Sequence, residues 1–507
     1  MKEIVVVSND PSDARILGDV CRVYFPGSVP EHLPLTETLE VEGLERDDIR
    51  IIIEEKTEPC SFRVKLYTEG QCYDGHSRDS GVFIDENQQN KRRRLLRLGL
   101  HQALVPYLLE RGRLVSPWGI LNMVRPTKTV HRLLNRALSP ESIINILQTE
   151  YDVRLEKAQL LTKIALKQQP ILAELKEEKA ISIYLSVPFC PTRCHYCSFP
   201  SFPLGKWGHL VVNYLDCLAE EIRATAGELK RLGYTVRTIY LGGGTPTVLT
   251  AEQLANLLSL LRDNYHLSPE VEITVEAGRP DTIDRLKLET LKANGVNRIS
   301  INPQTLHDET LQFIGRKHTA EDILTAYTLA REVGFPVINM DLIIGLPGEN
   351  SHLLAQTIER IVSLRPENIT LHALALKRAA SFKQEGVRGL PTDAEGAALT
   401  VQAQKALENA GYEAYYLYRQ KEIVGHGENV GYCLPEKASL YNILMMEEEQ
   451  TILGLGVGSS SKFIDPQTNY IDSIYNPKDL FLYQERLSQL IQRKVGKIRS
   501  FGVSERG

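Results

Sequence analysis

The sequence predicts an α/β protein with a partial (β/α)6 barrel at its centre. After Lys179, strand-like and helix-like segments alternate six times, and the strands are apolar almost throughout, as in a parallel sheet covered by helices. Before that point the strands come first and the helices follow, the order typical of an α+β domain. We therefore expect an N-terminal α+β domain (1–179), the barrel (180–390) and a C-terminal α+β region (391–507) that covers the open barrel face and the substrate.

The composition argues against two classes of partner. A net charge of −5 over 507 residues gives no electrostatic basis for nucleic-acid binding. The one basic run, Lys91–Arg94 with Arg97, lies inside an apolar helical pattern, so we interpret it as a solvated helix face. No apolar run approaches the length of a membrane span, and Ile4–Val7 is too short for a signal peptide. With eight cysteines, a reducing cytoplasm fits best.

The N-terminal domain carries no catalytic constellation that we can identify. Trp118-Gly119 and Arg125–Lys128 could touch a ligand, but a loop leading into a capped helix explains them, and we prefer that interpretation. The predicted strands are Ile4–Val7, Ile49–Glu54 and Phe62–Tyr67, and the predicted helices are Asn87–Gly112, Thr127–Ala137, Ser139–Gln148 and Leu155–Leu175.

The barrel region is predicted element by element from its periodicity. Thr250 with Gln253 and Thr319 with Asp322 have the spacing of helix capping boxes. The predicted strands are Ile181–Val187, Thr238–Gly242, Val271–Glu276, Arg298–Asn302, Val337–Ile343 and Ile369–Leu374. The predicted helices are Leu210–Leu232, Ala251–Tyr265, Ile283–Asn294, Ala320–Val333 and Leu353–Leu364. Reactive residues of such a layout lie at the carboxyl ends of the strands.

Three cysteines follow the first of these strands. Cys190, Cys194 and Cys197 have the spacing C-x3-C-x2-C. Because iron–sulfur clusters are usually held by four cysteines, three thiolates predict a [4Fe–4S] cluster with one open iron. The alternative is a zinc site that also uses His195, but structural zinc sites usually join two ligand pairs, and no second pair exists here.

Further polar groups fall at the ends of the next strands. A glycine-rich turn, Gly242–Thr247, follows the second strand and lacks the lysine of a phosphate-binding loop. Carboxylate, amide and guanidinium groups at successive strand ends suit a zwitterionic ligand that carries a ribose. These groups belong to Glu276, Gln304, Arg316 and Asp341.

The cysteine spacing, with an aromatic residue before the last cysteine, resembles the radical S-adenosylmethionine (SAM) enzymes. The match extends to the oxygen-independent coproporphyrinogen III oxidase family through Tyr184–Cys190, Gly243–Thr247 and Gly345–Pro347, and the intervening strand-end residues agree. Within that family, Cys197–Ser201, Tyr415–Gln420 and Glu428–Tyr432 look like the coproporphyrinogen dehydrogenase HemZ subgroup. The resemblance has motif-level specificity from about 180 to 463.

The resemblance implies a partial (β/α)6 radical SAM barrel and two cofactors, a [4Fe–4S] cluster and SAM. It implies oxidative decarboxylation of two propionates of coproporphyrinogen III, a tetrapyrrole, to give protoporphyrinogen IX in haem biosynthesis, with an external electron donor. The metal ligands would be Cys190, Cys194 and Cys197. The SAM contacts would be Tyr184, Tyr196, Gly243, Gly244, Thr245, Glu276, Gln304, Arg316, Asp341 and Ala375. The candidates for the substrate carboxylates are Arg316, Lys317, Arg378, Arg419 and Lys421.

Two positions depart from the founding oxidases of this family. They have a further cysteine where this chain has Phe199, and a histidine where it has Ser186. The family's haem-chaperone branch also lacks that cysteine. A haem-binding carrier with a possible ligand in His426 is therefore the alternative function. The tyrosines of 412–418 could line a porphyrin pocket or form a strand core.

Overall fold

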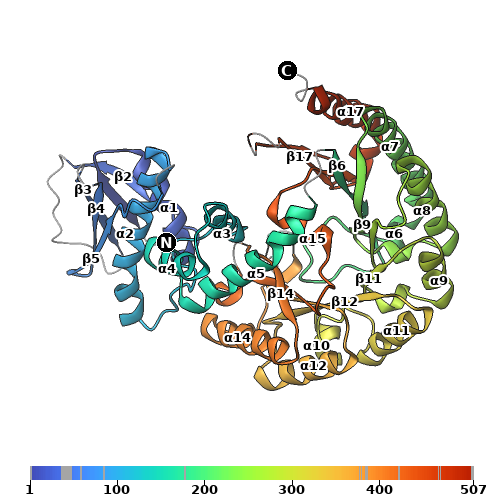
Figure 1. The fold of residues 1–507 in the computed structure, drawn as a ribbon. Helices are drawn as coiled ribbons and strands as arrows, with labels where there is room; N and C mark the ends of the chain where they lie inside the picture. Colours follow the sequence, from blue (N-terminus) through green and yellow to red (C-terminus); the bar gives the residue numbers. More distant parts are fainter. Residues whose placement is uncertain are drawn as a thin grey trace. The chain divides into compact units, whose positions relative to one another are not determined.

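The computed structural model describes residues 3–35, 48–56, 60–83, 86–175, 179–375, 377, 380–382, 386–420, 423–465, 468 and 470–503, and the side chains of these residues as far as 500. The chain divides into two compact units, Met1–Ala165 and Leu166–Gly507 (Figure 1). The predicted domain boundaries after 179 and 390 stay predictions. Among the described residues, no helix combines the length and the apolar character that a membrane span needs.

The first unit contains a five-stranded mixed sheet in the order β2-β1-β3-β4-β5. Strand β1 pairs in parallel with β2 and β3, whereas β3, β4 and β5 form an antiparallel meander. The strands are β1 (Ile4–Ser8), β2 (Glu31–Pro34), β3 (Ile49–Lys56), β4 (Ser61–Thr68) and β5 (Gln71–Arg78), and α1 (Ser12–Tyr24) connects the first two.

Three of these strands are confirmed predictions, and three elements were not predicted. Helix α1, β2 and β5 are absent from the predicted set. Strand β5 turns Tyr73, Gly75 and Ser77 inward, and only the first of these is large. Gly75 lies against α2, where a Cβ would come within 1.9 Å of the Gly99 carbonyl oxygen. An alternation of polar and small residues carries no hydrophobic signal.

The helices of the first unit follow the predicted order. They are α2 (Gln88–Glu110), α3 (Thr127–Leu134), α4 (Pro140–Tyr151) and α5 (Leu155–Glu174), the last of which extends into the second unit. The prediction of a solvated basic face on α2 is wrong for Arg94, and acidic residues of other elements pair with the run: Arg92 binds Asp13 of α1, and Arg94 binds Glu150 of α4. Acids from the segment before α2 add to these pairs. Arg94 is buried and binds Glu86 at 3.0 Å, and Lys91 binds Asp79 at 2.5 Å.

The second unit is organised by an eleven-stranded sheet, and six consecutive parallel strands form its centre. In spatial order they are β13 (Asn368–Ala373), β12 (Val337–Ile344), β11 (Arg298–Ser300), β10 (Glu272–Glu276), β9 (Thr235–Gly243) and β6 (Ala180–Val187). The sheet has two free ends, so the barrel is partial, as predicted.

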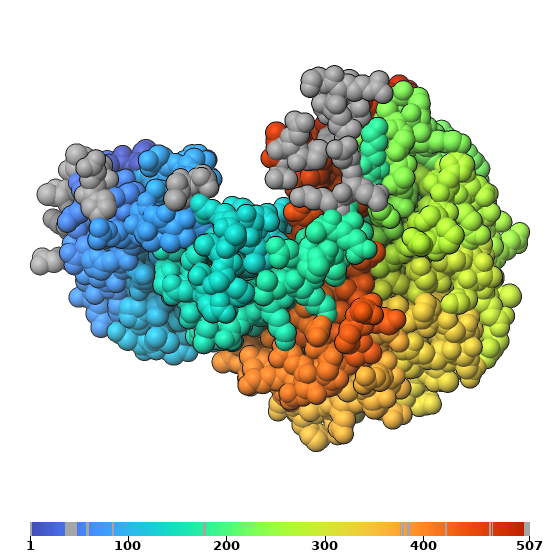
Figure 2. Space-filling view, viewed as in Figure 1, coloured from blue at the N-terminus to red at the C-terminus, as the bar shows by residue number. Residues whose placement is uncertain are grey.

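Helices follow the strands and cover the outer face of this sheet. In Figure 2 the side chains of α8, α9, α11 and α12 form one continuous surface, green to orange. Both predicted capping boxes are present, at Thr250 and Thr319. The helices are α6 (Leu204–Trp207), α7 (Val211–Leu232), α8 (Ala251–Tyr265), α9 (Arg285–Ala293), α10 (Asp308–Phe313), α11 (Ala320–Val333) and α12 (Ser351–Leu364).

The C-terminal segment extends both edges of the sheet. Strand β15 (Asn429–Cys433) pairs antiparallel with β13, and β14 (Glu413–Tyr418) pairs antiparallel with β15 at the edge. At the other side β16 (Ile452–Leu455) pairs in parallel with β6. A covering role for 391–507 stays a prediction. The remaining elements are α14 (Asp393–Asn409), α15 (Leu440–Glu447), β17 (Ser460–Ile464), β18 (Ile471–Tyr475), α16 (Leu480–Glu485) and α17 (Leu487–Val503).

A buried carboxylate fixes this C-terminal segment to α7. Glu221 accepts hydrogen bonds from Lys494 Nζ at 2.5 Å, Tyr483 Oη at 2.7 Å and Asn476 Nδ2 at 3.0 Å, and from the Gly456 amide at 2.8 Å. Both members of the ion pair have fully buried side chains. A buried charge without a partner is costly, so loss of these contacts would be unfavourable. Through them Glu221 fixes Gly456, Asn476, Tyr483 and Lys494 against α7.

The tyrosines of the C-terminal region mostly form core. Tyr415 and Tyr416 are buried in one hydrophobic cluster with Cys433 and Ile443. Tyr418 is half-buried, with its hydroxyl 3.3 Å from His372 Nδ1. Of the two interpretations of these tyrosines, the structure favours the strand core for the first two.

Candidate functional site

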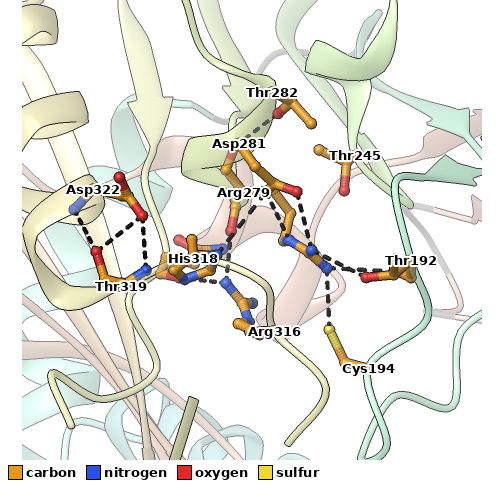
Figure 3. Close-up of polar contacts among 12 residues, drawn as sticks. Thr192, Cys194, Thr245, Arg279, Asp281, Thr282, Arg316, His318, Thr319 and Asp322 are labelled. Atoms are coloured by element: carbon orange, nitrogen blue, oxygen red, sulfur yellow. Dashed lines mark hydrogen bonds and ion pairs between the residues drawn. The ribbon is translucent and has the colours of Figure 1, made fainter. Parts of the chain in front are cut away.

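The predicted metal ligands lie close together in the sequence, beside two short paired strands, β7 (Phe189–Cys190) and β8 (Phe202–Pro203). Cys190 ends β7, and Cys194 and Cys197 follow on the connection to β8; we call the segment Cys190–Cys197 the cysteine loop. Cys194 is buried, while Cys190 and Cys197 are half-buried. Thr245 Oγ1 donates to Cys190 Sγ at 3.6 Å. Arg279 Nη1 donates to Cys194 Sγ at 3.5 Å, as Figure 3 shows. Neighbouring elements therefore contact two of the three sulfur atoms.

The three thiols also influence one another. Burial raises the pKa of Cys190 to about 11; Thr245 opposes this shift and the nearby Cys197 and Cys194 add to it. Burial likewise raises the pKa of Cys197. Cysteines bind metals as thiolates, so cluster binding has to supply the free energy of deprotonation. In the part of the chain that the structure describes, no three His, Cys, Asp or Glu side chains are grouped so that they could hold a metal ion, and the ligand set stays a prediction.

His195 is turned toward a different element. Its Nδ1 lies 2.9 Å from the Phe313 carbonyl oxygen, and its backbone amide donates to the Ile314 carbonyl at 3.0 Å. Both contacts are at the end of α10. The structure thus gives His195 a role in anchoring the cysteine loop, and it does not support the zinc alternative for this residue.

The glycine-rich turn packs directly on the cysteine loop. The amides of Gly244 and Thr245 donate to the carbonyls of Val187 and Phe189, both at 2.8 Å. A Cβ on Gly244 would lie 2.4 Å from the Phe189 carbonyl oxygen, and Gly243 has a φ of +104°. We predicted glycines here to let a ligand approach; the contact that requires them in the structure is with the chain itself.

Two carboxylates, Glu276 at the end of β10 and Asp341 within β12, have opposite electrostatic environments. Burial raises the pKa of Glu276 to about 7, and the charge of Asp341 adds to the shift, although Tyr240 donates a hydrogen bond to the carboxylate. Burial also acts on Asp341, but hydrogen bonds and the nearby His372 keep its pKa below the usual value. At neutral pH Asp341 is therefore ionised, and Glu276 is divided between its two forms.

Gln304 carries an unsatisfied acceptor. Its φ is +67°, and backbone hydrogen bonds to the Asp341 carbonyl (2.9 Å) and from the Ile343 amide (3.0 Å) fix it beside β12. The side chain is buried, and Oε1 has no hydrogen-bond partner among the described residues. Burial of an amide oxygen without a hydrogen-bond partner costs free energy. Gln304 Oε1 is therefore suited to accept a hydrogen bond from a bound ligand.

Arg316 is largely occupied by the protein. Nη1 donates to the carbonyls of Gly278 (2.9 Å) and Asn302 (2.8 Å), and Nη2 donates to Tyr196 Oη at 3.0 Å. Nε is buried without a partner among the described residues. Arg316 thus joins the cysteine loop to two strand ends, and its predicted contact with a ligand carboxylate stays a prediction.

The remaining predicted residues are placed as follows. Tyr184 stacks on Tyr240, with ring centroids 6.3 Å apart. Ala375 forms a single β-bridge to Ile423. Lys317 is exposed, Arg419 is buried, and His426 is half-buried in a 3-10 turn. Arg378 and Lys421 lie outside the described residues.

Sequence reasoning missed four polar residues of this region. Arg279 and Asp281 follow β10, His318 precedes α11, and His372 lies on β13 beside Asp341. Arg279 and His372 occupy strand-end positions like those of the predicted residues, and that position was the available signal. Nothing local to His318 marks it out, because its surroundings come from distant segments.

Comparison with known proteins identifies the family. Residues 184–361 match the model of the Radical SAM superfamily. Over 390 residues the chain is 42% identical to the oxygen-independent coproporphyrinogen-III oxidase-like protein HemZ of Bacillus subtilis (strain 168), which covers 75% of this chain and 77% of that protein. The chain belongs to the oxygen-independent coproporphyrinogen III oxidase-like family.

Other relatives of this radical SAM protein have different names. It is 31% identical over 304 residues to the heme chaperone HemW of Bacillus subtilis (strain 168), with 58% of this chain and 76% of that protein covered. Coproporphyrinogen III oxidase (HemN) from Escherichia coli, a radical SAM enzyme, has a similar structure, with a TM-score of 0.51 and 25% identity over 63% of this chain and 72% of that one.

Members of the radical SAM superfamily bind a [4Fe–4S] cluster and SAM, and the residues described above fit both. Three thiols within eight residues suit the cluster, because each sulfur binds a different iron and the three need not be close enough to share one metal ion. The partnerless Gln304 oxygen and the strand-end carboxylates suit a ligand that brings its own hydrogen-bond donors, as the ammonium and ribose hydroxyls of SAM do.

Proposed function

We propose that this protein carries out the oxygen-independent oxidative decarboxylation of coproporphyrinogen III to protoporphyrinogen IX. The observation that supports this most is the 42% identity to the coproporphyrinogen-III oxidase-like protein HemZ, joined to a structural likeness to the coproporphyrinogen III oxidase HemN. When bound, the cluster and SAM would supply a radical that removes one hydrogen atom from a propionate side chain; loss of CO2 and of one electron to an external one-electron acceptor then leaves a vinyl group. Eight cysteines without a disulfide fit a reducing cytoplasm.

The chain's own residues would hold and orient SAM. We assign Cys190, Cys194 and Cys197 to the cluster, and Glu276, Gln304 and Asp341 to the polar groups of SAM. The wall formed by Tyr184, Tyr240 and Tyr441 would exclude water, because these rings stack one on the next. Tyr196, Gly243–Thr245 and Arg316 would keep the cysteine loop and the SAM site in register.

The test is anaerobic turnover. The purified protein is reconstituted with iron and sulfide, reduced chemically, and given SAM, coproporphyrinogen III and a one-electron acceptor, and the tetrapyrrole is followed by mass spectrometry. We expect two propionates to be converted to vinyl groups, and no conversion by Cys194→Ala. Cys217→Ala, on α7, is the control for loss of a cysteine elsewhere. Release of 5′-deoxyadenosine without decarboxylation would contradict the proposal.

The second candidate is a haem carrier. It is supported by similarity to a heme chaperone and by Phe199, whose side chain is exposed where the founding oxidases have a cysteine. Haem titration followed by absorbance tests this function, with His426→Ala as the variant and His352→Ala, on α12, as the control. A shift of the Soret band that is seen in the wild type and in His352→Ala but not in His426→Ala supports a haem carrier. Absence of the shift in all three proteins would contradict this function.

A further inference from the structure

Arg279 has no place in the function argued so far, yet it is one of the most enclosed charged residues near the cysteine loop. It follows β10 and begins the 3-10 turn Pro280–Thr282. Its exposed fraction is 3%. An arginine stays charged under all conditions in a protein, so a buried guanidinium needs partners that satisfy it.

The two edges of the guanidinium have different partners, as Figure 3 shows. One edge forks onto Asp281, with Nε 3.1 Å from Oδ1 and Nη2 3.2 Å from Oδ2. The other edge meets the cysteine loop. There Nη2 donates to Thr192 Oγ1 at 3.1 Å, and Nη1 donates to the Thr192 carbonyl and to Cys194 Sγ, both at 3.5 Å.

Asp281 therefore aims the guanidinium at the sulfur. A bidentate carboxylate fixes the plane of an arginine as well as its position. The next group outward, His318, adds no charge at neutral pH, because burial and the charges of Arg316 and Arg279 lower its pKa to about 4. Its Nδ1 lies 4.0 Å from Asp281 Oδ1. The positive end of the Arg279–Asp281 pair thus faces Cys194.

We propose that Arg279 positions Cys194 and raises the reduction potential of the cluster that this cysteine helps to hold. The proposal rests on the cluster assignment made above. Reduction adds one electron from an external one-electron donor and leaves the cluster more negative. Hydrogen bonds and positive charge at a ligand sulfur favour that state. Asp281 has the opposite charge, so it limits the effect while it orients the arginine.

The test is a redox titration of the reconstituted [4Fe–4S] protein, followed by electron paramagnetic resonance. For Arg279→Gln, we expect the equilibrium constant for reduction to fall about tenfold, which is a potential lower by about 59 mV for one electron. Arg279→Lys, which keeps the charge but loses the fork, should shift the potential less. Arg285→Gln is the matched control, since Arg285 lies on α9 and pairs with Glu332 on the surface.

Asp281→Asn separates an electrostatic role from a structural one. Removal of the negative charge should raise the potential, the opposite direction to Arg279→Gln. If Arg279→Gln fails to retain iron, Arg279→Lys and Asp281→Asn decide the question. Unchanged potentials in the variants that retain iron, or shifts of the same sign from both positions, overturn the proposal, and so does a wild-type protein that binds no cluster. Because no tetrapyrrole enters this measurement, failure of decarboxylation leaves its outcome intact.

Discussion

Tyr240 donates a 2.8 Å hydrogen bond to Glu276 Oε1 at the carboxyl end of β10. The bond offsets only part of the cost of burying this carboxylate, whose pKa is raised to about 7 against 4.5 for an ordinary glutamate. Below pH 4.5 the carboxyl is protonated in both the folded and the unfolded chain. Between pH 4.5 and 7 only the unfolded chain releases the proton, so the free energy of unfolding falls as the pH rises.

Glu276→Gln should therefore stabilise the protein without cofactors. At pH 8 we expect a gain of about 3 kcal/mol in the free energy of unfolding, because a shift of about 2.5 pKa units corresponds to that amount; at pH 5 the gain should be below about 1 kcal/mol. Urea unfolding at the two pH values measures this, with Glu359→Gln on the exposed face of α12 as the control. Equal stability of wild type and Glu276→Gln at pH 8 would show that burial of the ionised Glu276 carboxylate does not destabilise the protein.

Each of the three loop cysteines should be needed for iron. Cys190→Ser, Cys194→Ser and Cys197→Ser should each lose most of the iron and sulfide after anaerobic reconstitution, because a [4Fe–4S] cluster with two cysteine ligands is poorly held. Chemical iron and sulfide analysis, with the visible absorption of the cluster, measures the loss. Cys217→Ser should retain the wild-type content. Wild-type iron in any of the three loop variants would remove that residue from the ligand set.

Gly244→Ala should disturb the contact between the glycine turn and the cysteine loop. The new methyl group would lie 2.4 Å from the Phe189 carbonyl oxygen, so one of the two backbones must move. Overpacking of this kind costs about 1–3 kcal/mol. Gly227→Ala is the control within α7, where a Cβ meets nothing within 4 Å and should stabilise the helix slightly. We expect lower stability and lower iron content for Gly244→Ala alone, and normal values would mean that the turn moves at little cost.

Lys494→Met should leave Glu221 charged and buried without its main partner. Removal of one member of a buried pair costs about 3–5 kcal/mol, whereas apolar replacement of both members is often neutral. Urea unfolding should thus show a large loss for Lys494→Met. Part of it should be recovered by Lys494→Met with Glu221→Gln, which removes the buried charge and keeps an oxygen that can accept from Tyr483, Asn476 and the Gly456 amide. A small loss in the single variant would indicate that Tyr483 and Asn476 suffice to hold the carboxylate.

The barrel could be predicted because its signals are local. Thr250 and Thr319 each form a capping box with the residue three positions later. Strands such as β6, β12 and β13 are rich in apolar residues and can be predicted without knowledge of their neighbours. The same applies to the cysteine loop. Its spacing of three sulfur atoms within eight residues is visible without a structure.

What the sequence could not provide depends on distant partners. Arg279 is ordinary in sequence and becomes notable only where Thr192 and Cys194 meet it, more than eighty residues away. Lys494 and Glu221 are 273 positions apart. The basic run of α2 likewise appears solvated in the sequence because two of its acidic partners, Asp13 and Glu150, lie on α1 and α4. Such pairings follow from the fold and leave no periodic trace.

The pairing of β16 with β6 has a consequence during synthesis. Strand β6 begins the central sheet, but the neighbour on its outer side is made more than 260 residues later, when Ile452–Leu455 has left the ribosome. Until then the growing chain carries an open strand edge next to the cysteine loop, and such an edge can pair with other chains. We therefore expect iron delivery to follow completion of translation, and chains cut before β16 to aggregate.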